Sequence, residues 1–316
     1  MLLRGRSSWD GRPLFCVWPA PPAGARKGSL MSEKYLLGMY EKAVPSNITW
    51  KERLEVAGES GFDYVEVSVD ESDARLARLE WTPAARQELV RTMNEVGVPV
   101  RSMCLSGHRK YPFGATDPAV RARSLEIMQK AVELACDLGV RTIQLAGYDV
   151  YYEEGTEDTR RWFAENLAKA VEMAAREGVL LGFETMETPF MDTVEKAMKY
   201  VDLIDSPYLG VYPDMGNLTN ASFLYGVSVA DDMKKGAGHI IAAHCKETIA
   251  GHYREIPFGT GTTDYEGALD VLVAQGVRRF VGEFWYVGSE KWREETKLAA
   301  EYVRGKIDAA FDRAGK

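Results

Sequence analysis

The segment SLEIMQKAVELACDLGVRTIQLAG, residues 124–147, decides the fold of this chain. Its first part spaces Leu125, Met128 and Val132 along one stripe, as in a helix that packs on a core. Gly139 ends that helix, because glycine readily takes the left-handed conformation found at helix C-termini. The apolar run that follows is typical of a strand buried on both faces. The segment therefore predicts a helix that leads back into a buried strand.

The same unit recurs along the chain. A helix pattern, a glycine and a β-rich run also meet in SGFDYVEVS, VGVPVRSMCLS, EGVLLGFETME and QGVRRFVGEFW, at Gly61, Gly97, Gly178 and Gly276. Their separation suits a strand, a loop and a crossover helix. With the segments between them, eight strands are expected, near residues 35–40, 62–68, 99–105, 141–146, 179–184, 208–213, 239–244 and 279–285. We therefore expect an α/β fold, a (β/α)8 TIM barrel over residues 34–316. The first helix–strand junctions lack GxGxxG, which argues against a dinucleotide-binding sheet.

Composition narrows the class of protein. The 316 residues are 46% hydrophobic and carry a formal net charge of −8 without a clustered basic run, which argues against a nucleic-acid partner. No apolar run approaches the roughly 20 residues of a membrane span, so no membrane partner is expected. The four cysteines show no paired spacing, as in a protein of the cytoplasm. Residues 1–33 are rich in Pro, Gly and Arg, and we expect a disordered N-terminal extension there, with Met31 as an alternative natural start.

Four expected strands end in side chains that can bind a metal. These are Glu184 in LGFE, Asp214 in VYPD, His244 in AAHCKE and Glu283 in VGEFW. Functional groups of such barrels lie at the carboxyl ends of the strands, so the four should meet at one mouth. Three carboxylates and one imidazole suit one divalent metal ion, Mn²⁺, Zn²⁺, Co²⁺ or Mg²⁺. Taken singly, each residue would more often form a salt bridge or a helix cap.

Several longer segments carry a family resemblance. They are GMYEKAVP, GFDYVEVSVDE, RSMCLSGHRKYPFG, TIQLAGYDVYY, YPDMGNL, HCKET and PFGTGTTDYEG. From Tyr35 to Phe311 the chain resembles the L-ribulose-5-phosphate 3-epimerases of L-ascorbate catabolism, also labelled hexulose-6-phosphate isomerases, among the xylose isomerase-like TIM barrels. The resemblance implies a divalent metal on Glu184, Asp214, His244 and Glu283. It also implies interconversion of L-ribulose 5-phosphate and L-xylulose 5-phosphate.

The chemistry of a 3-epimerase assigns roles to two of these residues. The proton at C3 must leave one face of the sugar and return to the other, through a cis-enediolate that the metal would stabilise. One base reaches only one face, so two are needed. Glu184 and Glu283 lie three strands apart in a ring of eight, on opposite sides of the sugar. We therefore expect both to be catalytic, one removing the proton and the other delivering it.

The residues that contact the substrate are less clearly indicated by the sequence than the metal ligands. Epimerases of free ketoses usually carry a histidine three residues after the aspartate of strand six. Asn217 stands there and is expected to contact substrate without that histidine's role. Glu66 ends strand two and could bind a sugar hydroxyl or be a structural carboxylate. The candidate phosphate donors are His108, Arg109, Lys110, Lys246 and Arg254, with solvated loop charges as the alternative for each.

Three other functions fit parts of this pattern. A ketose–aldose isomerase, such as one for hexulose 6-phosphate, would use the same barrel and metal. A metal-dependent endonuclease for abasic DNA would need more histidines than the four of this chain. A non-catalytic sugar-binding protein would not need two opposed carboxylates on a metal. We expect a ketopentose phosphate as substrate, and a homodimer remains an open option.

Overall fold

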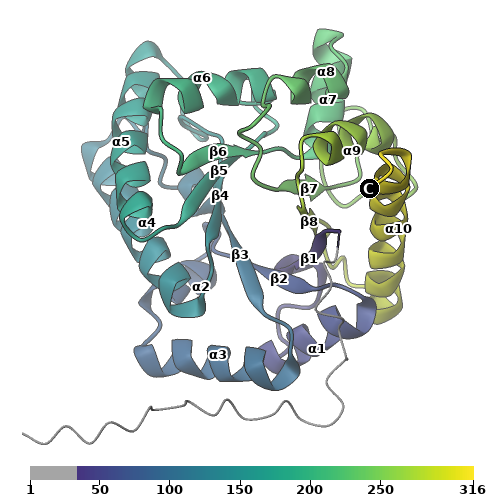
Figure 1. Ribbon diagram of the computed structural model, residues 1–316. Coiled ribbons are helices and arrows are strands. Elements are labelled where there is room, and N and C mark those ends of the chain that lie inside the picture. The colour runs from purple at the N-terminus through teal and green to yellow at the C-terminus, as the bar shows by residue number, and fades with distance from the viewer. Residues whose placement is uncertain (1–33) are drawn as a thin grey trace, which may run out of the picture. The chain divides into compact units, whose positions relative to one another are not determined.

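Eight parallel strands form a ring, and helices surround it (Figure 1). The computed structural model describes residues 34–316, so the expected extension over residues 1–33 lies outside the described residues. The strands are β1 Leu36–Tyr40, β2 Tyr64–Ser68, β3 Val100–Leu105, β4 Thr142–Ala146, β5 Leu180–Glu184, β6 Leu209–Tyr212, β7 Ala243–Cys245 and β8 Arg279–Gly282. The predicted (β/α)8 barrel is confirmed.

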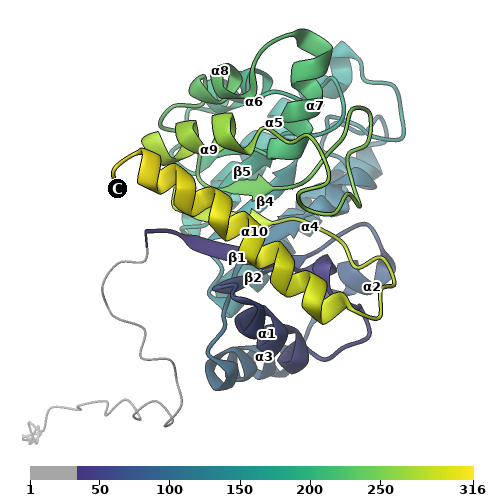
Figure 2. The same cartoon turned by 90° about the vertical axis from the view of Figure 1, so that its right-hand side faces the viewer.

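The helices alternate with the strands as expected. The longer ones are α1 Trp50–Ser60, α3 Pro83–Val96, α4 Pro118–Leu138, α5 Glu157–Arg176, α6 Val194–Ile204, α7 Met215–Tyr225, α9 Tyr265–Ala274 and α10 Trp292–Arg313. Short helices α2 Asp73–Leu76 and α8 Val229–Lys234 and the 3₁₀ turns η1 Glu41–Ala43, η2 Ala77–Glu80 and η3 Ser106–Arg109 lie in the connections. Helix α10 packs between α1 and α9 (Figure 2).

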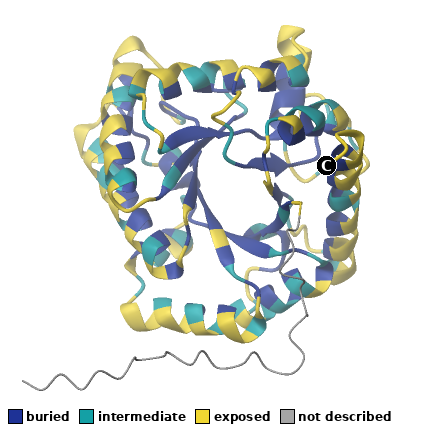
Figure 3. Cartoon of the chain, viewed as in Figure 1, coloured by how far each residue is buried: buried dark blue, intermediate teal, exposed yellow. Residues whose placement is uncertain are grey.

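The helix pattern read from the sequence matches the packing. Met128 and Val132 of α4 are buried, while Leu125 at its edge is half-buried. The helices turn their buried faces to the strands and their exposed faces outward (Figure 3). All five glycines that were expected to stop helices have positive φ, for example 74° at Gly139. Among residues 34–316, no helix combines the length and the apolar character needed to span a membrane.

The ring is nearly closed, with a weak seam between β6 and β7. The sheet order is β6-β5-β4-β3-β2-β1-β8-β7, and β6 meets the next segment only through the bridges Val211–Ile240 and Asp214–His244. The strand expected over 239–244 is therefore shorter, Ala243–Cys245. The backbone N–H of Val211 donates to the carbonyl of His239, but Pro213, next in the ladder, has no N–H to donate. The last expected strand also ends early, at Gly282 instead of 285.

Large side chains fill the interior of the barrel. Tyr64, at the start of β2, and Tyr212 are almost completely buried and belong to a cluster that Ile241 joins. Gly38 leaves room for the Tyr64 ring, because a Cβ there would lie 2.4 Å from its Cε2 atom. Gly182 leaves room in the same way for Ile241. A small pocket, lined by Leu36, Tyr64, Arg101 and Arg279 among others, remains at the amino ends of the strands, and the larger cavity lies at their carboxyl ends.

Candidate active site

The four predicted metal-binding residues meet at the carboxyl ends of the strands. Glu184 ends β5, Asp214 caps the N-terminus of α7 directly after β6, His244 lies in β7 and Glu283 follows β8. One ligand atom from each lies within 4.8 Å of the others. His244 Nδ1 is 3.1 Å from Glu184 Oε1, 3.4 Å from Glu283 Oε2 and 4.0 Å from Asp214 Oδ2. The group is buried and could hold a metal ion.

Two carboxylate oxygens of this group support the binding of a metal ion. Asp214 Oδ2 and Glu283 Oε2 are buried and accept no hydrogen bond from the described residues. A buried polar atom without a partner costs free energy, and each such atom in a native protein needs an explanation. A cation between the carboxylates would coordinate both oxygens. Three carboxylates and a neutral imidazole are a donor set that divalent first-row metals and Mg²⁺ accept. The residues therefore fit a divalent ion.

The charged groups of this site shift one another's pKa values. Burial raises the pKa of Asp214 to about 8, although Lys246 acts against this. Burial and the charge of Glu283 raise the pKa of Glu184. For Glu283, burial acts in the same direction, but Lys246 and His244 outweigh it and the pKa falls below its ordinary value. Burial would lower the pKa of His244, but the surrounding carboxylates raise it well above the ordinary value. Positive charge is therefore strongly favoured at this point.

A cavity opens directly above the group. Its floor includes Glu184 and Glu283, and the other lining residues come from the loops after the strands: Tyr40, Lys42, Cys104, Ser106, Arg109, Met186, Glu187, Asn217, Lys246, Tyr253, Arg254 and Trp285. Three cations reach its rim. Lys42 Nζ pairs with Asp70 (2.6 Å), and Arg254 Nη2 pairs with Glu187 (3.2 Å). Arg109 lies over the ring of Tyr151.

Four of the six predicted substrate residues line this cavity: Arg109, Asn217, Lys246 and Arg254. Lys246 lies deeper than a phosphate donor at the rim would. Its Nζ atom donates to Asn217 Oδ1 (2.8 Å) and is 3.1 Å from Asp214 Oδ1. Asn217 also donates from Nδ2 to the carbonyl of Thr185, which fixes its side chain. Lys246 and Asn217 thus border the metal-binding group, and Arg109 and Arg254 lie farther out.

The structure places the other two predicted substrate residues away from the cavity. Glu66 is fully buried behind His244, with its Oε1 atom 2.7 Å from His244 Nε2. The His108 Nε2 atom lies 3.1 Å from the carbonyl of Ser124, and the ring packs on Phe113. Burial lowers the pKa of His108 to about 4, so this side chain is neutral near pH 7, and it does not line the cavity. Neither position supports the expected substrate contact.

Some residues of the site were not anticipated. Gln144 Nε2 donates to Glu184 Oε2, and a polar residue inside the apolar strand TIQLA was a signal that could have found it. Glu187 accepts a hydrogen bond from Tyr148 Oη (2.6 Å) and pairs with Arg254. The only sequence feature that pointed to Glu187 was its position three residues after Glu184, which ends β5. Lys42 follows β1 in a 3₁₀ turn and had no signal of its own.

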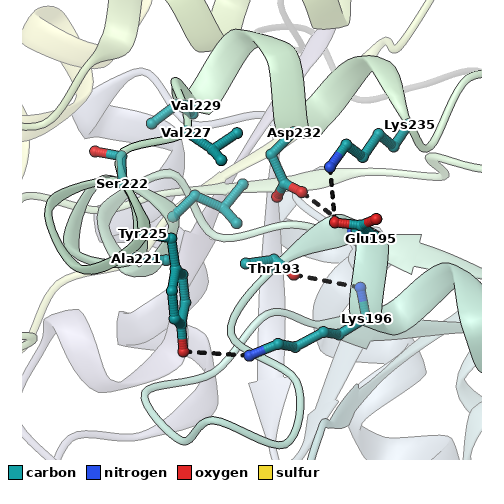
Figure 4. A pocket seen from close by; sticks show the side chains of 11 residues that line it. Thr193, Glu195, Lys196, Ala221, Ser222, Tyr225, Val227, Val229, Asp232 and Lys235 are labelled. Atoms are coloured by element: carbon teal, nitrogen blue, oxygen red, sulfur yellow. Dashed lines mark hydrogen bonds and ion pairs between the residues drawn. The ribbon is translucent and has the colours of Figure 1, made fainter.

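A second pocket lies outside the barrel, between α6, α7 and α8 (Figure 4). Lys196 reaches the hydroxyl of Tyr225 (3.2 Å) across it, and Lys235 pairs with Glu195 (2.7 Å) at its edge. None of the site residues predicted from the sequence lines this pocket. The chemistry therefore belongs to the cavity at the strand ends.

Comparisons with known proteins agree with this architecture. The family model described as xylose isomerase-like TIM barrel matches residues 54–305. L-ribulose-5-phosphate 3-epimerase UlaE of Escherichia coli O157:H7 is 43% identical over 282 residues, which are 89% of this chain and 98% of that protein. The protein of the same name from Escherichia fergusonii gives the same values.

Solved structures resemble the chain in fold. The D-psicose 3-epimerase of Clostridium cellulolyticum H10, solved with D-tagatose, has a TM-score of 0.72 at 16% identity, over 86% of this chain and 99% of that chain. An L-ribulose 3-epimerase has a TM-score of 0.67 at 20% identity, over 89% of this chain and 97% of that chain. At these identities they show the barrel alone. The sequence relatives go further: this chain belongs to the xylose isomerase-like TIM-barrel family and, within it, to the L-ribulose-5-phosphate 3-epimerases.

Proposed function

We propose that this protein is a metal-dependent 3-epimerase that interconverts L-ribulose 5-phosphate and L-xylulose 5-phosphate. The observation that carries the proposal is a pair of buried carboxylates, Glu184 and Glu283, which line the cavity and lie 3.1 Å and 3.4 Å from His244 Nδ1. They come from β5 and the end of β8, three strands apart in the ring. The 43% identity to proteins named L-ribulose-5-phosphate 3-epimerase supports this choice of sugar phosphate.

Glu184, Asp214, His244 and Glu283 would hold one divalent ion, Mn²⁺, Zn²⁺, Co²⁺ or Mg²⁺. When bound, the ion supplies Lewis-acid stabilisation of the negative charge that develops on the sugar oxygens next to C3. Lys246 adds a second positive charge at the same place, because its Nζ atom lies 3.1 Å from Asp214 and 3.5 Å from Glu283. Both effects make the proton at C3 more acidic.

Glu184 and Glu283 move the proton. One carboxylate removes the proton from C3, which leaves a planar enediolate, and the other delivers a proton to the opposite face and inverts the centre. Gln144 donates to Glu184 and thereby holds one carboxylate in place. Lys246 lies beside Glu283 and holds its pKa down, together with His244. The two carboxylates exchange roles in the reverse reaction.

The phosphate group needs cations at the rim. We assign it to Arg109 and Arg254, which line the cavity and lie farther from the metal-binding group than Lys246. Arg254→Ala and Arg109→Ala should raise KM for L-ribulose 5-phosphate more than they lower kcat. Free L-ribulose is the matched control, because its turnover should be equally poor in the variants and the unchanged enzyme. An unchanged KM for the phosphorylated sugar in both variants would redirect the search to Lys42.

The main test follows product formation by NMR in D₂O. The protein is supplied with Mn²⁺ and L-ribulose 5-phosphate, and L-xylulose 5-phosphate with deuterium at C3 is expected. A ketose–aldose isomerase would instead give an aldose. An aldose product, or no conversion of either ketose phosphate with any of the four metals, would overturn the proposal.

Glu184→Gln and Glu283→Gln test the two proton carriers. Each variant should lose epimerisation, because one face of the sugar is left without a base. Each should still exchange the C3 proton with solvent from one epimer only, and the two variants should prefer opposite epimers. The bound metal is measured in parallel, since both residues are also ligands. Near-normal epimerisation by a metal-loaded variant would contradict the assignment.

The substrate indicates the metabolic route in which the enzyme acts. We propose that it serves L-ascorbate or related pentose catabolism in the cytoplasm, where ketopentose phosphates are made and used. A homodimer remains a prediction, and light scattering of the purified protein would test it.

A further inference from the structure

The carboxylate of Glu66 lies inside the barrel, where it links four strands. Its Oε1 atom is 2.7 Å from Nε2 of His244 in β7. Its Oε2 atom accepts hydrogen bonds from the hydroxyls of Ser102 in β3 (2.7 Å) and Tyr212 in β6 (2.9 Å). Glu66 itself belongs to β2 and has no exposed surface. Every contact that fixes this carboxylate is therefore internal.

The two nitrogens of His244 face different groups. Nε2 faces Glu66, whereas Nδ1 faces Glu184, Glu283 and Asp214, the other members of the metal-binding group. An ionised carboxylate can only accept a hydrogen bond, so the proton on this edge of the ring belongs to Nε2. Nδ1 faces carboxylates as well, so a bound cation would take the place of a proton there and use the Nδ1 lone pair. The second nitrogen of a metal-binding histidine commonly contacts such a carboxylate, which fixes the ring and its tautomer.

We propose that Glu66 is a positioning residue for the metal: it holds His244 with Nδ1 directed into the metal-binding group, and Ser102 and Tyr212 hold Glu66. This inference rests on the metal site of the proposed function, but not on the sugar that the enzyme converts. It replaces the substrate contact expected for Glu66. It also explains why a carboxylate is buried in the middle of an apolar strand, where an unpaired charge would be costly.

The position of Tyr212 strengthens the assignment. Its ring packs edge-on against His244, with centroids 4.9 Å apart, while its hydroxyl donates to Glu66. One side chain thus contacts both members of the pair. Tyr212→Phe keeps the ring contact and removes only the donor to Glu66. It separates the positioning of the carboxylate from the packing of the histidine.

The experiment measures affinity for Mn²⁺ alone by calorimetry, together with the visible absorption of the Co²⁺-loaded protein. Glu66→Gln keeps the shape of the side chain and removes its charge. We expect about a tenfold or larger loss of Mn²⁺ affinity and a changed Co²⁺ spectrum. Ser102→Ala and Tyr212→Phe should give smaller losses in the same direction. Asp149→Asn is the matched control, because this buried carboxylate accepts a hydrogen bond from Thr159 (2.8 Å) and does not touch the metal-binding group.

The outcomes separate this inference from the proposed function. Affinity and Co²⁺ spectrum equal to those of the unchanged protein in Glu66→Gln would overturn the positioning role alone. An equal loss in Asp149→Asn would also overturn it, because general destabilisation would then explain the effect. If Glu66→Gln does not fold, unchanged Mn²⁺ affinity in both Ser102→Ala and Tyr212→Phe overturns it. Normal metal binding by the unchanged protein without epimerisation in the NMR assay would refute the function and leave the positioning role standing.

Discussion

Removing Arg78 should destabilise the protein and loosen one wall of the cavity. Arg78 pairs with both oxygens of Glu41, at 2.5 Å and 2.6 Å, and donates to the carbonyl of Ser68. Glu41 is fully buried in η1, the 3₁₀ turn that follows Tyr40 and contains Lys42. Arg78→Met keeps the aliphatic part of the side chain and removes the charge. The Glu41 carboxylate then remains buried without its main partner.

The structure sets the size of the effect. Breaking a buried ion pair by removing one partner costs about 3–5 kcal/mol. Glu41 would keep the backbone N–H of Ser68 (2.8 Å) and a distant contact with Arg75 (3.9 Å). We therefore expect a loss near the lower limit, about 3 kcal/mol in the free energy of unfolding at pH 7. Glu41→Gln/Arg78→Met should recover a large part of it, because no buried charge is left unpaired.

The loss should depend on pH in a definite direction. Burial raises the pKa of Glu41, but Arg78 outweighs it and the pKa lies below its ordinary value. A lowered pKa gives stability that is present above the unfolded pKa and disappears as pH falls through the folded pKa. In Arg78→Met the carboxyl group protonates more easily. The difference between the two proteins should therefore shrink as pH falls below about 4.

Urea unfolding of the metal-free proteins at several pH values measures both effects. Steady-state kinetics on the loaded enzyme should show a raised KM, since Tyr40 and Lys42 line the cavity. A loss below about 1 kcal/mol at pH 7, the range of exposed ion pairs, would refute the reasoning. A double variant no more stable than Arg78→Met would refute it as well.

Three further predictions concern other parts of the molecule. Gly210→Ala should cost about 1–3 kcal/mol of unfolding free energy, because its Cβ would lie 2.4 Å from the carbonyl oxygen of His239; Gly305→Ala, with open space around it in α10, should instead stabilise by about 1 kcal/mol, and equal midpoints of thermal unfolding would contradict both. His108 has a pKa lowered by burial to about 4, so the unfolded chain binds a proton before the folded protein does, and stability should fall by up to about 3 kcal/mol from pH 6.5 to pH 4. A parallel decline in His108→Gln would exclude this cause. Mn²⁺ at 100 times its Kd should stabilise the fold by about 2.7 kcal/mol, reversibly with a chelator, and an unchanged melting temperature would count against a metal site.

The sequence predicted most of the fold because its signals were local and repeated. Gly139 and the four similar glycines each mark a helix end, and the spacing between them requires a crossover unit. The seam beside β6 could not be foreseen in the same way. It depends on Pro213 lying opposite the segment that contains Ile241, and such a pairing across the sheet exists only in three dimensions.

The meeting of four possible metal ligands at one mouth could be predicted for the same reason as the strands. Glu184, Asp214, His244 and Glu283 each stand at the end of a strand of the repeating unit, and such ends meet at one mouth of the barrel. The buried position of Glu66 beside His244 could not be predicted, because neighbouring residues on one strand can face the barrel interior and the mouth. The expected phosphate contact of His108 could not be judged from the sequence for a related reason. Its loop folds back, and its ring contacts α4 instead of the cavity. Loop conformation depends on packing that no local pattern records.

The packed interior at the amino ends of the strands has a kinetic consequence. Tyr212 packs against His244 and lines the small pocket at the amino ends, so its ring stands between the two. A cation at His244 and a sugar above it would then both enter through the cavity at the carboxyl ends. A sugar phosphate in the cavity would then stand between the ion and bulk water. Ion exchange should become slower when the enzyme is saturated with substrate, and the two should depart in a fixed order, sugar first. A chelator would then inactivate the resting enzyme faster than the working one.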